Sequence, residues 1–441
     1  MKLSKLALIA AIACGTYAGN VFADQTNDIQ LVACESDCDC GEPVCGCEPA
    51  CDEDACDGGC DSAGLGLDIG NGKLRNRVGD CLSLGDCCLG DPWELFGECN
   101  RISVGGWAQL GYQSGQQSFG GPPSPSRPNA TDGVNDYPDH LQLQQGWLFA
   151  EKAIDASCGL DIGGRVDFLY GTDGQDLQAV GNWDEAFDNE WDNGGYYGSA
   201  LPQLYMEVGY GDLSVKIGHM LLNFGYESAM APNNFFYSHS YAFNNLQPYT
   251  GTGAIATYTG LENVTFSGGF IEGLNTGFDS NGDVLVAGVG LDLTDRLDVQ
   301  YNVVAGRLVN NIGGPTAIKG AIHSIVAAYD VRCDLKYVME ATLNKADFGL
   351  SDEAPSATGI TNYLIKTLND CNSVGLRYGW VGEEFDNGDA DDFHELTIGW
   401  NHRRSANLII RPEVRWDWVS ERDTDNRDDH ASFAVDAIMT F

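Results

Sequence analysis

The sequence has 441 residues, enough for one large domain or two or three small ones, and its formal net charge is −40, from 64 acidic and 24 basic residues. This charge argues against a nucleic-acid-binding protein, which needs a basic surface. The 56 glycines and the aromatic content of 10% favour a sheet-rich protein with tight turns.

Residues 1–23 have the pattern of a secretory signal peptide. A basic start precedes the apolar stretch Leu6 to Ala13, and Val21-Phe22-Ala23 provides a cleavage site with a small final residue. The apolar stretch is too short for a transmembrane helix. Cys14 leaves lipidation open as an alternative. Because no later run of 18 apolar residues occurs, a membrane-spanning form of this chain would have to be a closed barrel.

Residues 24–100 form an acidic, cysteine-rich segment that we expect to lie in the periplasm. Its apolar content is too low for a core, so only cross-links or metal could order it. Export favours disulfides or intermolecular cross-links. Disorder and soft-metal binding through the two C-x-C pairs are the alternatives. The disulfide candidates are Cys34, Cys38, Cys40, Cys45, Cys47, Cys51, Cys56 and Cys60.

From Ile102 the pattern predicts sixteen strands, joined by connections that alternate between long loops and short turns. The predicted strands are Ile102–Gln113, Leu141–Ala153, Gly159–Tyr170, Pro202–Tyr210, Leu213–Leu222, Gly251–Thr259, Val264–Ile271, Val284–Leu293, Leu297–Leu308, Ala321–Val331, Leu335–Ala346, Ile360–Leu368, Ser373–Glu383, Phe393–His402, Leu408–Ser420 and Ala431–Phe441.

This alternation predicts that residues 101–441 form an antiparallel transmembrane β-barrel of about 16 strands. Short turns and both chain ends then lie on the periplasmic side, and the long loops lie outside the cell. In the last strand every second residue from Phe433 to Phe441 is apolar, so this strand is expected to close the barrel. A soluble β-sandwich is the alternative, but it has no reason to alternate its connection lengths.

Charged residues recur on one face of several strands. In the strand Leu408–Ser420, Arg411, Glu413 and Arg415 share the face opposite Val414. A charge facing lipid at mid-membrane would cost about 2–4 kcal/mol, so we expect these side chains to face inward. Whether they only hydrate the pore or set a transverse field is open. The predicted pore-lining residues are Arg165, Asp167, Glu207, Lys216, Lys336, Glu340, Arg377, Glu395, Arg411, Glu413, Arg415 and Asp417. Pro412 cannot donate to its neighbour, which predicts a local bulge.

The connection Asn223–Thr250 is long, aromatic and nearly uncharged. A loop of this length without regular structure is usually functional. Projecting outward, it would expose a large apolar surface. We therefore expect it to fold inward and constrict the pore, with an external contact loop as the alternative. The residues expected at the constriction are Glu227, Asn233, Asn234, Tyr237, His239 and Tyr241.

No catalytic motif stands out, and the sequence predicts neither an enzyme nor a cofactor. The seven histidines are scattered, and the G-x-S-x-G, H-E-x-x-H and Walker patterns are absent from the sequence.

Several stretches in order resemble the OmpL-like β-barrel porins of bacterial outer membranes. They include L-F-A-E-K at 148–152, G-G-R-V-D-F-L-Y-G-T-D at 163–173, A-P-N-N-F-F-Y-S-H-S-Y at 231–241 and R-P-E-V-R-W-D-W at 411–418. The resemblance runs from about residue 90 to Phe441 and implies an outer-membrane barrel that acts as a porin. It carries over no substrate and no catalytic residue. The terminal Phe441 also resembles the signal that the barrel-assembly machinery reads.

Two functions compete. The first is a porin for passive diffusion of small hydrophilic solutes or ions, with acidic loops enriching cations at its mouth. The second is a non-conducting structural or adhesive envelope protein, cross-linked through the cysteine-rich segment. The partners expected are outer-membrane lipid, the barrel-assembly machinery and, as one option, two further copies in a homotrimer.

Overall fold

The computed structural model describes Leu89, Pro92 and residues 101–115, 134, 137–157, 159–179, 196–278, 283–309, 318–347, 356–384, 390–420 and 430–441. The predicted signal peptide, the eight disulfide candidates and nearly all of segment 24–100 lie outside this part. Within it, no helix is long and apolar enough to cross a membrane.

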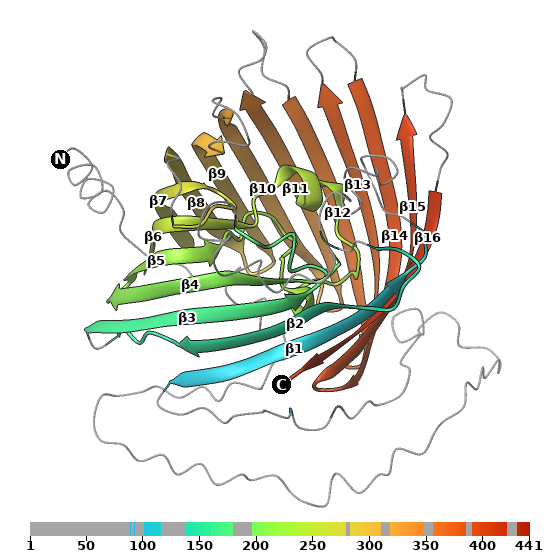
Figure 1. Cartoon of the computed structure of the whole chain (residues 1–441), viewed down its shortest axis with the longest axis horizontal. Helices are drawn as coiled ribbons and strands as arrows, with labels where there is room; N and C mark the ends of the chain where they lie inside the picture. Colours follow the sequence, from blue (N-terminus) through green and yellow to red (C-terminus); the bar gives the residue numbers. More distant parts are fainter. Residues whose placement is uncertain are drawn as a thin grey trace, which may run out of the picture.

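Sixteen antiparallel strands form a closed barrel, as predicted (Figure 1). They are β1 (Ile102–Gln113), β2 (Gln142–Lys152), β3 (Leu160–Gly171), β4 (Gly198–Tyr210), β5 (Leu213–Leu221), β6 (Thr250–Leu261), β7 (Val264–Leu274), β8 (Asp283–Thr294), β9 (Leu297–Val309), β10 (Ile318–Arg332), β11 (Leu335–Asp347), β12 (Ser356–Asn369), β13 (Asn372–Glu384), β14 (Ala390–Ser405), β15 (Leu408–Ser420) and β16 (His430–Thr440).

Each strand pairs with its sequence neighbours, and β1 closes the barrel against β16. Their register runs from Trp107 opposite Thr440 to Gln113 opposite Ala434. Phe441 and Gly106 exchange two backbone hydrogen bonds of 2.9 Å at the end of this seam. The barrel therefore leaves no free sheet edge, which is what a closing strand must achieve.

The connections alternate in length around the barrel. Seven short turns, such as 211–212 and 295–296, lie at one end, which we call the short-turn end. Longer connections, such as 222–249, lie at the opposite long-loop end. At the short-turn end, Ala406 N donates a 3.0 Å hydrogen bond to Leu89 O.

The period-two pattern places apolar side chains outside and polar ones inside. On β15, Val414 and Trp416 are 36% and 40% exposed on the outer face, whereas Arg411 and Arg415 are buried inside. The predicted bulge at Pro412 is wrong. The β14–β15 pairs on either side of it, Gly399 with Glu413 and His402 with Ile410, keep one register. The missing N–H interrupts the hydrogen bonding there without inserting a residue.

Candidate functional site

The connection between β5 and β6, residues 222–249 (the lumen loop), lies inside the barrel. Its helix α3 (Tyr241–Leu246) is visible within the ring of strands (Figure 1). A hydrogen bond of 2.8 Å from Leu222 N to Tyr249 O closes the base of the loop. The aromatic side chains that made this segment conspicuous are buried, with Tyr237 fully covered and Phe243 4% exposed. Contact with the inner wall thus removes them from water.

Two short helices shape the lumen loop. The 3₁₀ helix η2 (Ala231–Asn233) carries a proline in its first turn, where the missing N–H needs no partner. Helix α3 follows Ser240, whose Oγ accepts a hydrogen bond from Phe243 N at 3.1 Å. Serine is a preferred N-cap because its side chain satisfies one of the unpaired N–H groups of the first turn. Local sequence therefore contributes directly to the loop's conformation.

Three buried arginines of the wall donate hydrogen bonds to carbonyl oxygens of the lumen loop. The bonds run from Arg377 Nη1 to Ser238 O (2.5 Å), from Arg415 Nη1 to His239 O (2.7 Å), and from Arg411 Nη1 to Ala231 O (3.0 Å) and Asn234 O (2.5 Å). A hydrogen bond from an ionised donor is about twice as strong as a neutral one. The wall therefore binds the loop's main chain and does not merely pack against it.

Buried carboxylates of the same wall bind the loop's donors. Glu413 accepts from Tyr237 N (3.0 Å) and Ser238 N (3.1 Å), Asp417 from Tyr241 Oη (2.7 Å), and Glu340 from Tyr226 N (3.1 Å) and from Gln247 Nε2. Buried donors and acceptors that find partners avoid a large desolvation cost. The inner wall of β11, β13 and β15 thus supplies hydrogen-bond partners for both the donors and the carbonyl oxygens of the loop.

Glu227 is the one acidic residue of the lumen loop. Its Oε1 accepts from Arg377 Nη1 at 2.8 Å and from Tyr363 Oη at 3.0 Å, and its Oε2 accepts from Ser240 N at 2.8 Å. Burial by itself would raise the pKa of this carboxyl, but the Arg377 guanidinium, His239 and these hydrogen bonds together leave the pKa below its usual value. Glu227 therefore stays ionised and joins the loop to β12 and β13.

The ring of His239 is buried among the same groups. It stacks on Phe243, with ring centroids 4.5 Å apart, and its Nε2 lies 3.2 Å from Ser228 O. Burial lowers the pKa of His239 to about 4, against the smaller opposing effect of Glu227. The imidazole is therefore neutral at physiological pH, and protonation would add a charge beside the arginines that hold the loop.

Ion pairs within the wall hold the arginines in position. The pairs are Arg377–Glu395 (3.4 Å), Arg415–Glu395 (2.7 Å), Arg415–Asp417 (2.8 Å) and Arg411–Asp436 (2.5 Å). All six side chains are nearly or fully buried, with at most 11% exposure. A buried ion pair contributes mainly orientation when its remaining hydrogen bonds are satisfied.

The loop is also attached to strands on both sides of this wall. On β2, Gln144 Nε2 donates to Tyr237 Oη at 2.6 Å and Gln145 Nε2 donates to Ala229 O at 2.8 Å. On β9, Asn302 Nδ2 donates to Phe224 O at 2.9 Å. Strands β2, β9, β13 and β15 therefore all hydrogen-bond to one connection, which crosses the interior.

The remaining predicted pore-lining residues lie away from this contact. Arg165 pairs with Asp167 at 2.6 Å and with Glu151 at 2.8 Å on β2 and β3. Lys216 is half-buried, stands opposite Glu207 in register, and has its Nζ 4.7 Å from the centre of the Tyr205 ring. Lys336 is half-buried opposite Asp330. Glu207, Lys216 and Lys336 are half-buried near the short-turn end, whereas Asp167 is fully buried.

The structure brings together nine of the predicted titratable groups: Glu227 and His239 of the loop with Glu340, Arg377, Glu395, Arg411, Glu413, Arg415 and Asp417 of the wall. Asn234 joins them through its main chain, while Asn233 N donates to Met230 O within the loop at 3.0 Å. The sequence analysis missed Gln144, Gln145, Asn302, Tyr363 and Asp436. The available signal was their inward position in strands that alternate polar and apolar residues. The neutral residues among them were not weighed, and Asp436 was recognised only as lying between the apolar residues of the last strand.

No group of three or more His, Cys, Asp and Glu side chains is arranged to hold a metal ion within the part of the chain that the structure describes. The buried charges are paired with one another or bonded to the loop. The arrangement can hold a segment across the barrel. Its described side chains do not place a nucleophile, a base and an oxyanion donor together.

Residues 101–441 match the family described as "Putative beta-barrel porin-2, OmpL-like". A search of curated proteins found no match. Among solved structures, Salmonella typhi OmpF in complex with daunomycin is 12% identical with a TM-score of 0.53, covering 78% of this chain and 98% of that one. The trimer form of Vibrio cholerae OmpT is 10% identical, with a TM-score of 0.53 and coverages of 77% and 99%. An anion-selective porin from Comamonas acidovorans is 12% identical, with a TM-score of 0.51 and coverages of 77% and 99%.

At these identities the structural likeness concerns the fold alone, whereas the family match extends over the whole barrel. The match, the closed sixteen-strand barrel and its polar interior agree with one another. The chain therefore belongs to the OmpL-like family of β-barrel porins of the outer membrane.

Proposed function

We propose that the protein is a channel for passive diffusion of small hydrophilic solutes or ions, narrowed by the lumen loop. A sixteen-strand barrel encloses a lumen wide enough for water. The single observation that carries the proposal is the attachment of one loop to nearly opposite walls, by Gln145 of β2 and Asn302 of β9, which lie seven strands apart around the closed barrel. A loop bound on both sides divides the cross-section and leaves only narrow passages for solutes.

A preference for cations is part of the proposal. Three half-buried aspartates, Asp292, Asp298 and Asp330, line adjacent strands β8 to β10 on the inner face, with Lys336 as a nearby cation. The net charge of the chain is −40. Excess negative charge along a low-dielectric passage raises the local concentration of cations.

The test is single-channel recording of the full chain, refolded and inserted into planar bilayers under a KCl gradient. Steady conductance with a reversal potential shifted toward the equilibrium potential of potassium supports a cation-preferring channel. A folded, heat-modifiable barrel that never conducts would refute it and would favour the structural or adhesive role. Conductance with a reversal potential shifted toward the equilibrium potential of chloride would refute the cation preference but not the channel.

We further propose that the short-turn end and both chain ends face the periplasm, that the C-terminal strand is read by the barrel-assembly machinery, and that three copies assemble in the membrane. Short turns facing the periplasm are the rule for such barrels. Cross-linking in intact membranes and protease access from outside test the assembly and the orientation. Protection of the long loops from external protease would contradict the orientation.

A further inference from the structure

An apolar patch lies on the inner wall of β7 to β10, near the long-loop end. It comprises Ile271, Val284, Val304, Leu308 and Ile322, all between 0% and 4% exposed. Register places Ile271 beside Val284 and Val304 beside Ile322. Their strand neighbours Phe270 and Leu285 are 41% and 43% exposed on the outer face, so the patch faces inward. The interior of such a barrel is normally polar, because water fills it.

One residue of the lumen loop, Phe224, covers this patch. The ring is 4% exposed and packs into the same cluster, with Leu222 at its edge. Asn302 Nδ2 holds the main chain there by donating to Phe224 O at 2.9 Å and to Asn223 O at 3.3 Å. The contact between loop and wall here is mainly apolar, whereas the contact with β11 to β15 combines apolar packing with ion pairs and charge-assisted hydrogen bonds. The two sides of the loop are thus held by different combinations of forces.

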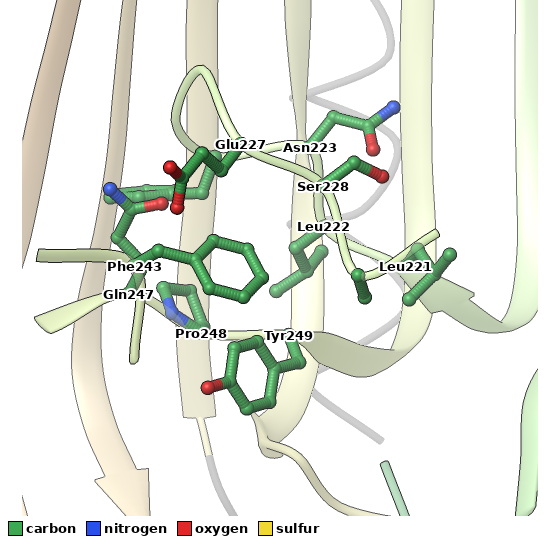
Figure 2. Close-up of a pocket in the computed structure, with 11 residues that line it drawn as sticks. Leu221, Leu222, Asn223, Glu227, Ser228, Phe243, Gln247, Pro248 and Tyr249 are labelled. Carbon is green, nitrogen blue, oxygen red and sulfur yellow. The ribbon is translucent and has the colours of Figure 1, made fainter. Parts of the chain in front are cut away.

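A small hollow adjoins Phe224 inside the loop itself. Its lining combines Leu222, Phe243 and Tyr249 with the polar side chains of Glu227 and Gln247. In the view of Figure 2, the polar ends of Glu227 and Gln247 lie on one side of the Phe243 ring, and Leu222 lies on the other. Apolar surface beside a few fixed polar groups is the usual composition of a small-molecule site.

We propose that the β7–β10 patch is a binding site for the aromatic part of a permeating solute, which exchanges with Phe224. Phe224 itself demonstrates that the patch accepts a phenyl ring. Exchange of one ring for another keeps the apolar surface out of water, so it costs little burial free energy. The charged contacts of residues 231–241 hold the rest of the loop in place meanwhile. The preferred solutes are therefore small polar molecules that carry an aromatic ring. This inference rests on the proposed channel and names its solute class.

Proteoliposomes containing the full chain test the proposal through the uptake of phenyl β-glucoside relative to methyl β-glucoside. Phe224→Ala removes the competing ring and should raise the phenyl-to-methyl uptake ratio. Val304→Thr keeps the shape of the patch and replaces one methyl group by a hydroxyl. Because one methyl group in an apolar pocket changes selectivity by about tenfold or more, Val304→Thr should lower the ratio by about that factor. Phe235→Ala, which alters another loop aromatic outside the patch, should leave the ratio unchanged.

An equal rise in the uptake of both sugars by Phe224→Ala would overturn the proposal, because Phe224 would then be only a steric obstacle. An unchanged ratio in Val304→Thr would also overturn it. Binding is measured separately by saturation-transfer NMR with phenyl β-glucoside on the chain in detergent. Binding that weakens in Val304→Thr supports the site even if no channel conducts. The absence of binding to both wild type and Phe224→Ala would refute the site whatever the conductance.

Discussion

Replacing Arg377 with methionine should release the lumen loop from the wall. The guanidinium is fully buried and bonds to Glu227 and Ser238 of the loop and to Glu395 of the wall. Its loss leaves two buried carboxylates short of a cation, which typically costs about 3–5 kcal/mol. Since about 1.4 kcal/mol corresponds to a factor of ten, the ratio of docked to undocked loop should fall by about a hundredfold to several thousandfold. Single-channel conductance should rise, and current fluctuations should increase.

The matched control is Lys336→Met, which removes the same charge from the inner wall at a half-buried position facing Asp330. It should leave the loop docked, so that current fluctuations and the protease resistance of the loop match those of the wild type. Heat-modifiability on gels verifies that both barrels are folded. Limited proteolysis reports the loop directly, because an undocked loop exposes residues 223–249 to protease. If Arg377→Met conducts like the wild type and its loop resists cleavage equally, the guanidinium does not hold the loop. Arg377→Lys should be intermediate, because an ammonium lacks the planar fork that serves several acceptors at once.

Three further predictions concern other contacts of the loop and the seam. Lowering the pH from about 6.5 toward about 4 should loosen the loop. His239 is neutral when docked, with its pKa lowered from 6.5 to about 4, so its stabilising effect is complete above about 6.5 and is lost as the pH falls. The shift corresponds to at most about 3 kcal/mol. Conductance in wild type should rise over this range, and a pH response of the same size in His239→Gln would contradict the assignment. Glu227, whose pKa is also lowered, acts in the same direction at the acid end of the range. Glu413→Ala should weaken docking of the loop by about 1–3 kcal/mol, because the N–H groups of Tyr237 and Ser238 lose their acceptor. Glu413→Gln retains one carbonyl oxygen and should weaken docking less. Equal proteolysis of the loop in the two variants would refute this prediction. Deletion of Phe441 removes two hydrogen bonds to Gly106, each worth about 0.5–1.5 kcal/mol, and should lower the unfolding temperature of the barrel without altering conductance.

The sixteen strands could be predicted because their signal is local. A strand that separates lipid from water alternates apolar and polar residues along its own length, so Leu408–Ser420 can be recognised without knowledge of its partners. The alternation of long and short connections then implied a closed antiparallel barrel. The predicted strands Ile102–Gln113 and Leu408–Ser420 coincide with β1 and β15. The bulge at Pro412 was predicted from a single residue and is absent, because neighbouring pairs keep the register across it.

The inward position of the charged side chains could also be predicted from local sequence, but the groups that they bind could not. Sequence periodicity placed Arg377, Arg411 and Arg415 on the inner face, where water or counter-charges were the two evident partners. Only the tertiary structure places carbonyl oxygens of the lumen loop, more than 130 residues away in sequence, against these guanidinium groups. The contribution of neutral residues such as Gln144 and Tyr363 depends on the same distant contacts.

The sequence by itself therefore determined the strand pattern, the closed barrel and the inward set of charges, because each follows from which side of a strand meets lipid. The tertiary structure decided what those charges bind, where the loop crosses the lumen and why the wall of β7 to β10 carries the apolar patch beneath Phe224. These features depend on pairs of residues far apart in the chain. Their free energy arises only when the barrel closes and removes both partners from water.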